Sequence, residues 1–264
     1  MVRSRRQSDR TGINILMEIK WKKKLFIVGI NSLFNLTWPC TCLSSRVVRI
    51  ISAASSEDFN ADIVFALDYS LSVSEEELKM EIDFIQHLSK SLNEDSRDST
   101  AAVVLYGETA QTVIPFRPIG RGAFFDKLEE LRTGGLRPKP AEMGRRMDAA
   151  LIEAAKKLGA TEKGTRDQHH LVILFTAGKQ LYDKEREEDN DCLTSVYKQL
   201  SSQDIQIIVV PIGLEIDFKE LGLIVKRPQS LFPVSSFDEL NLNKAKATAS
   251  SIEKTVGETF HSLR

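Results

Sequence analysis

Apolar residues along this chain gather in short, almost unbroken runs that alternate with longer stretches of helical spacing. Three such runs are Ile63–Leu67, Leu171–Phe175 and Ile205–Ile212. A run of this length is typical of a strand that is buried on both faces of a parallel sheet. A further strand is expected at Ala101–Tyr106, and Gln111–Phe116 is expected to pair back with it at the sheet edge, where its proline is tolerated.

Between these runs, apolar residues recur at spacings of three and four, which predicts amphipathic helices. The helices are expected at about 76–92, 124–131, 142–158, 184–200, 218–224 and 245–263, with one more short strand at Leu231–Val234. Ser74 and Glu77 form a capping-box pattern that opens the first helix. Strands that alternate with helices predict a doubly wound α/β fold, with a mostly parallel sheet, one antiparallel edge strand and helices on both faces.

Charge is unevenly distributed along the chain. Residues 1–60 carry ten Lys and Arg against four Asp and Glu, whereas the remainder carries 26 against 33. The predicted folded part is therefore mildly acidic, and nothing in it favours a nucleic-acid partner. Three cysteines are too few for a disulfide framework, and Cys40 and Cys42 lack metal-site spacing. Cys192 falls in a predicted helix and is expected to be a half-buried free thiol.

The first 60 residues have the order of a targeting segment. A basic flank precedes the apolar run Leu25–Ile30, and small residues follow it. This order predicts a signal peptide at about 17–44, with Met17 as an alternative start, inside a basic leader and linker of residues 1–60. The folded domain is then expected at 61–264. The other interpretation is an uncleaved basic leader on a cytoplasmic protein. The apolar run is too short and too polar for a stable membrane span.

The first strand ends in a group of oxygen-bearing side chains, Asp68, Ser70 and Ser72. They lie in a strand-to-helix loop at the carboxyl edge of the predicted sheet, where open α/β sheets hold their ligands. Carboxylate and hydroxyl oxygens are the ligands that Mg²⁺, Mn²⁺ and Ca²⁺ prefer. The alternative is a polar loop whose hydroxyls only cap the following helix.

The order of elements, together with three motifs, resembles the von Willebrand factor type A domain family, which includes the integrin inserted domains. The stretch 62–72 resembles the family's first strand with its DxSxS motif, and 143–151 resembles its TGxALDxAL helix. Residues 204–213 and 232–240 resemble its last two strands and closing turn. The resemblance covers residues 61–262 and implies a Rossmann-like fold with a metal-ion-dependent adhesion site.

Two positions depart from the family pattern. The resemblance implies a Thr before the TGxALDxAL helix and an Asp after the fourth strand, and this chain has Ala141 and Ala177 there. Each replacement removes an oxygen that would face the ion. An incomplete site made of Asp68, Ser70 and Ser72 is therefore expected to bind Mg²⁺, Mn²⁺ or Ca²⁺ weakly or not at all.

A lysine close to the altered position offers a second hypothesis. Lys179 lies two residues beyond Ala177, and its ammonium could pair with Asp68 and stand in for the missing cation. The alternative is that Lys179 points to solvent, as most lysines do.

The resemblance implies a non-enzymatic protein-binding or adhesion module of a secreted or cell-surface protein. Its expected partner is a protein ligand, and extracellular-matrix proteins are among the candidates. The alternative is an intracellular scaffold or assembly protein of the same family. The chain has no nucleophile elbow and no phosphate-binding glycine loop, which argues against an enzyme.

Expression in a secretory cell is expected to release a chain that begins near Ser45, because an apolar core behind three lysines precedes small residues suited to cleavage. N-terminal sequencing of the released protein checks this. Intact cytosolic protein that still contains Trp21 would contradict it.

Overall fold

The computed structural model describes residues 60–92, 98–135, 144–160, 168–179, 190–225 and 227–262, without the side chains of 190–191 and 257–262. All of these residues belong to a unit that comprises Ser56–Arg264. The predicted signal peptide and its leader, together with Cys40, Cys42 and Ala141, lie outside the described residues.

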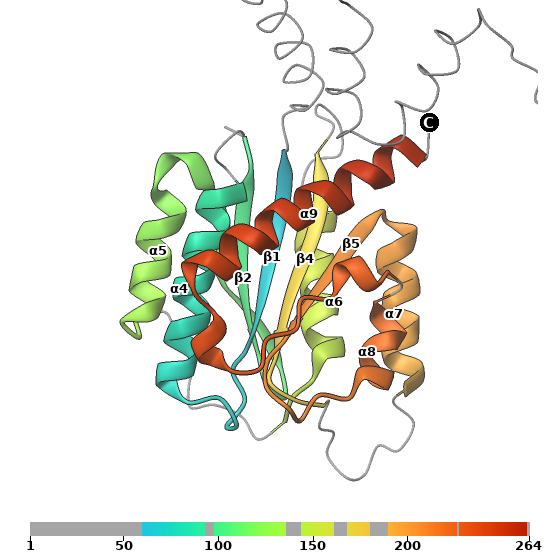
Figure 1. Ribbon diagram of the computed structural model, residues 1–264, viewed down its shortest axis with the longest axis horizontal. Coiled ribbons are helices and arrows are strands. Elements are labelled where there is room, and N and C mark those ends of the chain that lie inside the picture. The colour runs from blue at the N-terminus through green and yellow to red at the C-terminus, as the bar shows by residue number, and fades with distance from the viewer. Residues whose placement is uncertain are drawn as a thin grey trace, which may run out of the picture. The chain divides into compact units, whose positions relative to one another are not determined.

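The described residues form one five-stranded sheet in the order β3-β2-β1-β4-β5 (Figure 1). The strands are β1 (Ala61–Asp68), β2 (Thr100–Tyr106), β3 (Ala110–Pro118), β4 (His169–Thr176) and β5 (Ile205–Pro211). Strand β1 pairs in parallel with β2 and β4, β4 pairs in parallel with β5, and β3 runs antiparallel to β2 at the edge. The predicted fold class is confirmed.

Helices cover both faces of the sheet. One face carries α4 (Glu75–Leu92), α5 (Ala123–Arg132) and α9 (Leu242–Ser262), and the other carries α6 (Met147–Gly159), α7 (Asn190–Ser202) and α8 (Phe218–Ile224). Three short 3₁₀ helices, Ile119–Arg121, Pro228–Ser230 and Phe237–Glu239, lie in the connections. The strands therefore end at two opposite sides of the sheet. The carboxyl ends of the four parallel strands lie together at one of these sides, the carboxyl edge.

The two helical layers explain why the strand sequences are apolar without interruption. In β1, Ile63 and Phe65 pack into the core beneath α4, α5 and α9, whereas Val64 and Ala66 pack into the core beneath α6, α7 and α8. Successive strand residues point to opposite faces, so a strand covered on both sides needs apolar residues at every position. Every residue of β1 is buried.

Helix α6 begins later than its periodicity predicts. The predicted start at 142 is wrong, because residues 144–146 are not helical and Arg146 is the N-cap, with φ −112° and ψ 89°. The backbone N–H of Arg146 donates to the carbonyl of Gly107 at 2.8 Å, in the hairpin turn between β2 and β3. That tertiary hydrogen bond holds the segment before α6 extended against the hairpin.

The predicted strand at Leu231–Val234 is present only as two isolated parallel bridges to β5, Val209 with Leu231 and Ile212 with Val234. The amino-terminal half of β5 therefore forms the lateral edge of the sheet on the side opposite β3. No helix in the described part of the chain combines the length and the apolar character that a membrane crossing requires.

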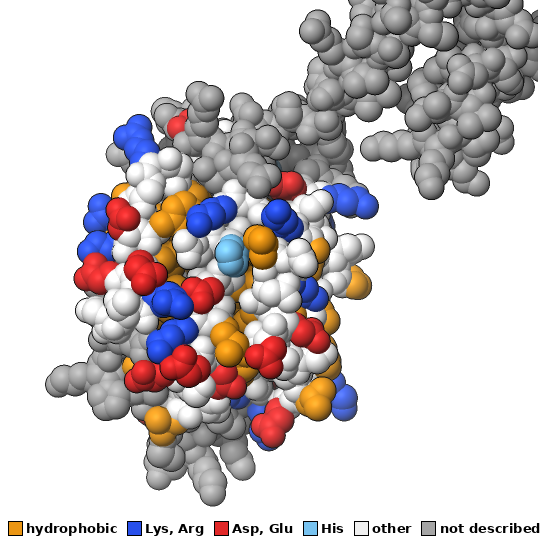
Figure 2. All heavy atoms as spheres, turned by 60° about the vertical axis from the view of Figure 1, so that its left-hand side comes forward, with side chains coloured by type: hydrophobic (Ala, Val, Ile, Leu, Met, Phe, Trp, Pro, Cys, Tyr) orange, Lys and Arg blue, Asp and Glu red, His pale blue; other side chains and the backbone are white. Residues whose placement is uncertain are grey.

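Helices α4 and α5 form a face on which positive and negative side chains are intermixed (Figure 2). Arg132 pairs with Asp83, Lys127 with Glu130 and Lys79 with Glu76 on this face. Exposed pairs of this kind contribute about 0–1 kcal/mol each. Mixed charge also means that this face lacks the basic stripe that binds a nucleic-acid backbone.

Replacing Ile173→Ala in β4 is expected to lower the free energy of unfolding by about 2–5 kcal/mol, because it leaves a cavity in a closely packed layer. The side chain of Ile173 is 0% exposed. Urea denaturation measures the loss. Leu214→Ala is the matched control, because Leu214 is 92% exposed and should change stability by no more than about 0.5 kcal/mol. Equal small effects at both positions would contradict the assignment of β4 to the core.

Candidate functional site at the carboxyl edge of the sheet

The loop between β1 and α4 places Asp68, Ser70 and Ser72 together at the carboxyl edge. Asp68 ends β1 and is fully buried, and its Oδ1 accepts the backbone N–H of Ser70 at 3.0 Å. The hydroxyls of Ser70 and Ser72 lie 2.7 Å apart. Helix α4 is capped by Ser74 and Glu77, each of which accepts the other's backbone N–H, so the capping box is confirmed. The hydroxyls of Ser70 and Ser72 are thus free of a capping role.

The side chain that meets these oxygens is Arg145, from the extended segment before α6. Its Nε donates to Asp68 Oδ2 at 2.6 Å, one Nη donates to the hydroxyl of Ser72, and the other donates to the backbone carbonyl of Lys179 at 3.1 Å. The side chain of Arg145 is 5% exposed and that of Asp68 is 0% exposed. One guanidinium therefore joins the loop after β1 to the loop after β4.

The cation beside Asp68 is Arg145, and the hypothesis that Lys179 pairs with Asp68 is wrong. Lys179 is exposed and contributes only its backbone carbonyl to this network. The sequence did hold a signal for Arg145, because two arginines stand within the stretch that resembles TGxALDxAL. This signal was overlooked because the predicted helical start at 142 placed residue 145 inside a helix, and not in an extended segment that reaches Asp68.

The loop after β4 is shaped around the guanidinium. The backbone N–H of Ala177 donates to Asp68 Oδ2 at 3.3 Å, and Ala177 has no side-chain oxygen to add. A Cβ atom on Gly178 would lie 2.3 Å from an Nη atom of Arg145, so the guanidinium would have to shift. Gly178 therefore leaves the space that the guanidinium of Arg145 occupies.

The second arginine of the pair turns the other way. Arg146 donates to the carboxylate of Asp148, which is fully buried at the start of α6. The thiol of Cys192 on α7 lies 3.3 Å from the same carboxylate. Cys192 is half-buried and lies in a helix, as predicted. Asp148 thus fixes the start of α6 and with it the segment that carries Arg145.

Burial and the negative charge of Asp68 raise the pKa values of two further groups, Glu81 and Tyr106. Burial and the negative charge of Asp68, in that order, raise the pKa of the Glu81 carboxyl well above its ordinary value of 4.5, with a smaller contribution from Glu77. Burial and Asp68 also raise the pKa of Tyr106, whose hydroxyl donates to the carbonyl of Phe175 at 2.6 Å. Neither oxygen of Glu81 has a hydrogen-bond partner among the described residues. Both shifts favour the neutral form of the group, and Asp68 is the carboxylate that pairs with Arg145.

These residues do not fit a divalent ion. Such an ion needs about six oxygen ligands and compensating negative charge. Arg145 already holds Asp68 and Ser72, two of the three residues predicted as ligands. Among the described residues there is also no group of three or more His, Cys, Asp or Glu that could hold a metal.

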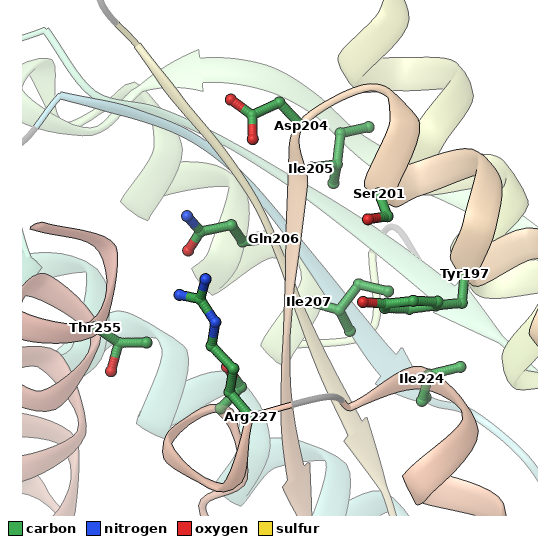
Figure 3. A pocket seen from close by; sticks show the side chains of 10 residues that line it. Tyr197, Ser201, Asp204, Ile205, Gln206, Ile207, Ile224, Arg227 and Thr255 are labelled. Carbon is green, nitrogen blue, oxygen red and sulfur yellow. The ribbon is translucent and has the colours of Figure 1, made fainter. Parts of the chain in front are cut away.

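A hollow of about 160 Å³ lies elsewhere, at the amino-terminal end of β5 (Figure 3). In it the side chain of Arg227 extends toward Gln206, and the ring of Tyr197 lies beside Ile207. Asp68 ends its strand at the opposite edge of the sheet, so this hollow is separate from the candidate site.

Comparison with known families decides the identity of this fold. The model of the von Willebrand factor type A domain matches residues 62–246, which is more than half of the chain. The chain belongs to the von Willebrand factor type A domain family. The match spans the DxSxS loop, the Arg145 segment and the loop after β4, so the site lies wholly within the A domain.

Individual relatives of this A domain share modest identity. Matrilin-3 of Gallus gallus is 25% identical over 171 residues, which cover 63% of this chain and 34% of matrilin-3. The chain therefore spans about a third of the length of that relative.

Solved structures show the same fold. Proximal thread matrix protein 1 from the mussel byssus matches with a TM-score of 0.57 and 21% identity, over 74% of this chain and 48% of that one. Manganese-loaded TRAP protein of Plasmodium vivax matches with a TM-score of 0.54 and 22% identity, over 72% of this chain and 74% of that one. Another structure of the mussel protein has a zinc-occupied MIDAS motif. Those neighbours hold a metal ion, whereas in this A domain Arg145 contacts Asp68 and Ser72.

Glu81→Gln is expected to gain stability relative to the wild type as the pH rises. Glu81 holds its proton more tightly in the folded chain, so wild-type stability falls as the pH rises from the unfolded pKa, near 4.5, through the raised folded pKa. Glutamine does not titrate, and its fixed packing cost is the same at every pH. Denaturant unfolding at about pH 5 and about pH 8 measures the difference.

The control for this experiment is Glu215→Gln, because Glu215 is exposed in the loop after β5. Its stability should follow that of the wild type at both pH values. A Glu81→Gln difference that is the same at both pH values would contradict the raised pKa.

Proposed function

We propose that this chain is a non-enzymatic protein-binding module of the adhesion and matrix type, part of a secreted or cell-surface protein, and that it binds its partner without needing a divalent ion. The observation that carries the proposal is the contact of Arg145 with Asp68 and Ser72 within an A domain. The loops at the carboxyl edge are tied by the chain itself, so the binding face is formed in the absence of metal. The similarity to matrilin-3 and to a byssal matrix protein supports the matrix setting.

Exposed apolar side chains mark the face that we assign to the partner. Leu71 lies between Ser70 and Ser72 and is 61% exposed, and Leu214, directly after β5, is 92% exposed. Both loops follow carboxyl ends of parallel strands, and only β4 separates β1 from β5. Strands are spaced by about 4.8 Å, so the two loops start about 10 Å apart. Apolar side chains held out from such loops suit anchors that a protein partner buries.

A metal-free face also restricts the chemistry of the partner. An ion with an open coordination position attracts an acidic residue of the partner, whereas a guanidinium that is buried and already paired with Asp68 does not. Apolar contacts at Leu71 and Leu214, together with backbone groups of the loops, are therefore expected to supply the affinity.

The experiment is a solid-phase binding series in which the full chain is offered to a panel of purified extracellular-matrix proteins, in EDTA and in magnesium. At least one protein is expected to bind saturably with the same Kd in both buffers. Leu71→Asp is expected to weaken that binding at least tenfold, because a charge replaces an apolar anchor, and a tenfold change corresponds to about 1.4 kcal/mol.

The matched control is Ile152→Asp, since Ile152 is 47% exposed on α6, away from this edge. It should bind as the wild type does. Absence of binding across the panel, loss of binding in EDTA, or equal weakening by Ile152→Asp would each contradict the proposal.

A further inference from the structure

We infer that Arg145 is a built-in cation that takes the place of the divalent ion at the carboxyl edge of this A domain, so that the site is closed to metal by the chain itself. The inference concerns the site on which the proposed function rests. It is tested by ion binding and by stability, which are measured without any protein partner. The inference and the proposed function can therefore fail independently of each other.

The carboxylate of Asp68 already accepts three hydrogen bonds. Its Oδ1 accepts the backbone N–H of Ser70 at 3.0 Å, and its Oδ2 accepts both Nε of Arg145 at 2.6 Å and the backbone N–H of Ala177 at 3.3 Å. A metal ion at Oδ2 would have to take the place that the guanidinium now holds. An ion that entered would have to displace the guanidinium first, and would meet its like charge at contact distance.

The guanidinium also reproduces the mechanical role of an ion. It bonds to a carboxylate and a hydroxyl of the loop after β1 and to a carbonyl of the loop after β4. Three donors in a fixed planar fork hold these groups with defined directions, which a point charge on a flexible lysine would not do. Its charge of +1 balances the single carboxylate of Asp68.

Two glycines lie where the backbone around Arg145 is closely packed. A Cβ on Gly178 would lie 2.3 Å from an Nη atom of Arg145, and a Cβ on Gly144 would lie 3.1 Å from the Cα of Glu108 in the hairpin turn. The first glycine makes room for the guanidinium. Gly144 allows the segment that carries Arg145 to lie close against the hairpin, where the N–H of Arg146 donates to the carbonyl of Gly107.

The first experiment is a titration of the full chain with Mn²⁺ alone, followed by calorimetry and by thermal unfolding. The wild type is expected to show no saturable binding and no rise in Tm up to about 5 mM Mn²⁺, above the affinity range of weak extracellular sites. The double variant Arg145→Gln with Ala177→Asp removes the cation and adds a carboxylate. It is expected to bind one Mn²⁺ at least tenfold more tightly than the wild type and to gain Tm with the ion.

Saturable Mn²⁺ binding by the wild type that is lost in Asp68→Asn would overturn the inference. So would a double variant that folds and yet binds Mn²⁺ no better than the wild type. If the double variant does not fold, the wild-type titration still decides, and Arg145→Lys adds a second measurement. That variant keeps the positive charge but loses the planar guanidinium, so it is expected to have a lower Tm and still no response to Mn²⁺. An unchanged Tm would contradict the role of Arg145 in joining the loops after β1 and β4.

The second experiment tests the space beside Arg145. Gly178→Ala is expected to lower Tm, because the added methyl group overlaps the guanidinium. The control is Gly222→Ala on α8, where a Cβ would meet nothing within 4 Å, and its Tm should be unchanged or higher. Equal Tm values for the two variants would show that Arg145 does not lie against Gly178.

Discussion

The arrangement of the carboxyl edge depends on one buried ion pair between Asp68 and Arg145. A carboxylate with no solvent exposure is costly unless charge and hydrogen bonds compensate it. Here three N–H groups and one full positive charge converge on it. Removing one member of such a pair costs about 3–5 kcal/mol, because the remaining charge is left buried and unpaired. The loops after β1 and β4 and the segment before α6 therefore keep their relative positions only while both members are present.

The charges near this pair follow from the same constraint. A monovalent guanidinium balances one carboxylate, so the ionisation of a further acid beside Asp68 is disfavoured. Burial and Asp68 raise the pKa values of both Glu81 and Tyr106, which favours the neutral form of each group. A divalent ion would require the opposite solution, with more negative side chains gathered around it. Ala177, in the position where the family has an acid, is consistent with the monovalent solution.

Much of this structure could be predicted from local sequence patterns, and one central feature could not. Unbroken apolar runs located the buried strands, and the position of Asp68 after such a run placed the site at the carboxyl edge. The pairing partner of Asp68 was missed because helical periodicity was extended back through residue 145. What keeps that segment extended is a hydrogen bond to Gly107 and a space left by Gly178, both distant in the chain. Interactions of that kind leave no trace in the spacing of apolar residues.

The space beside Gly178 has an evolutionary consequence. An arginine at position 145 takes this position without a shift where residue 178 lacks a Cβ, and a glycine at 178 leaves a gap if residue 145 is small. The two positions are 33 residues apart in sequence and should therefore be inherited together, since a change at one alone is penalised either by overlap or by a void.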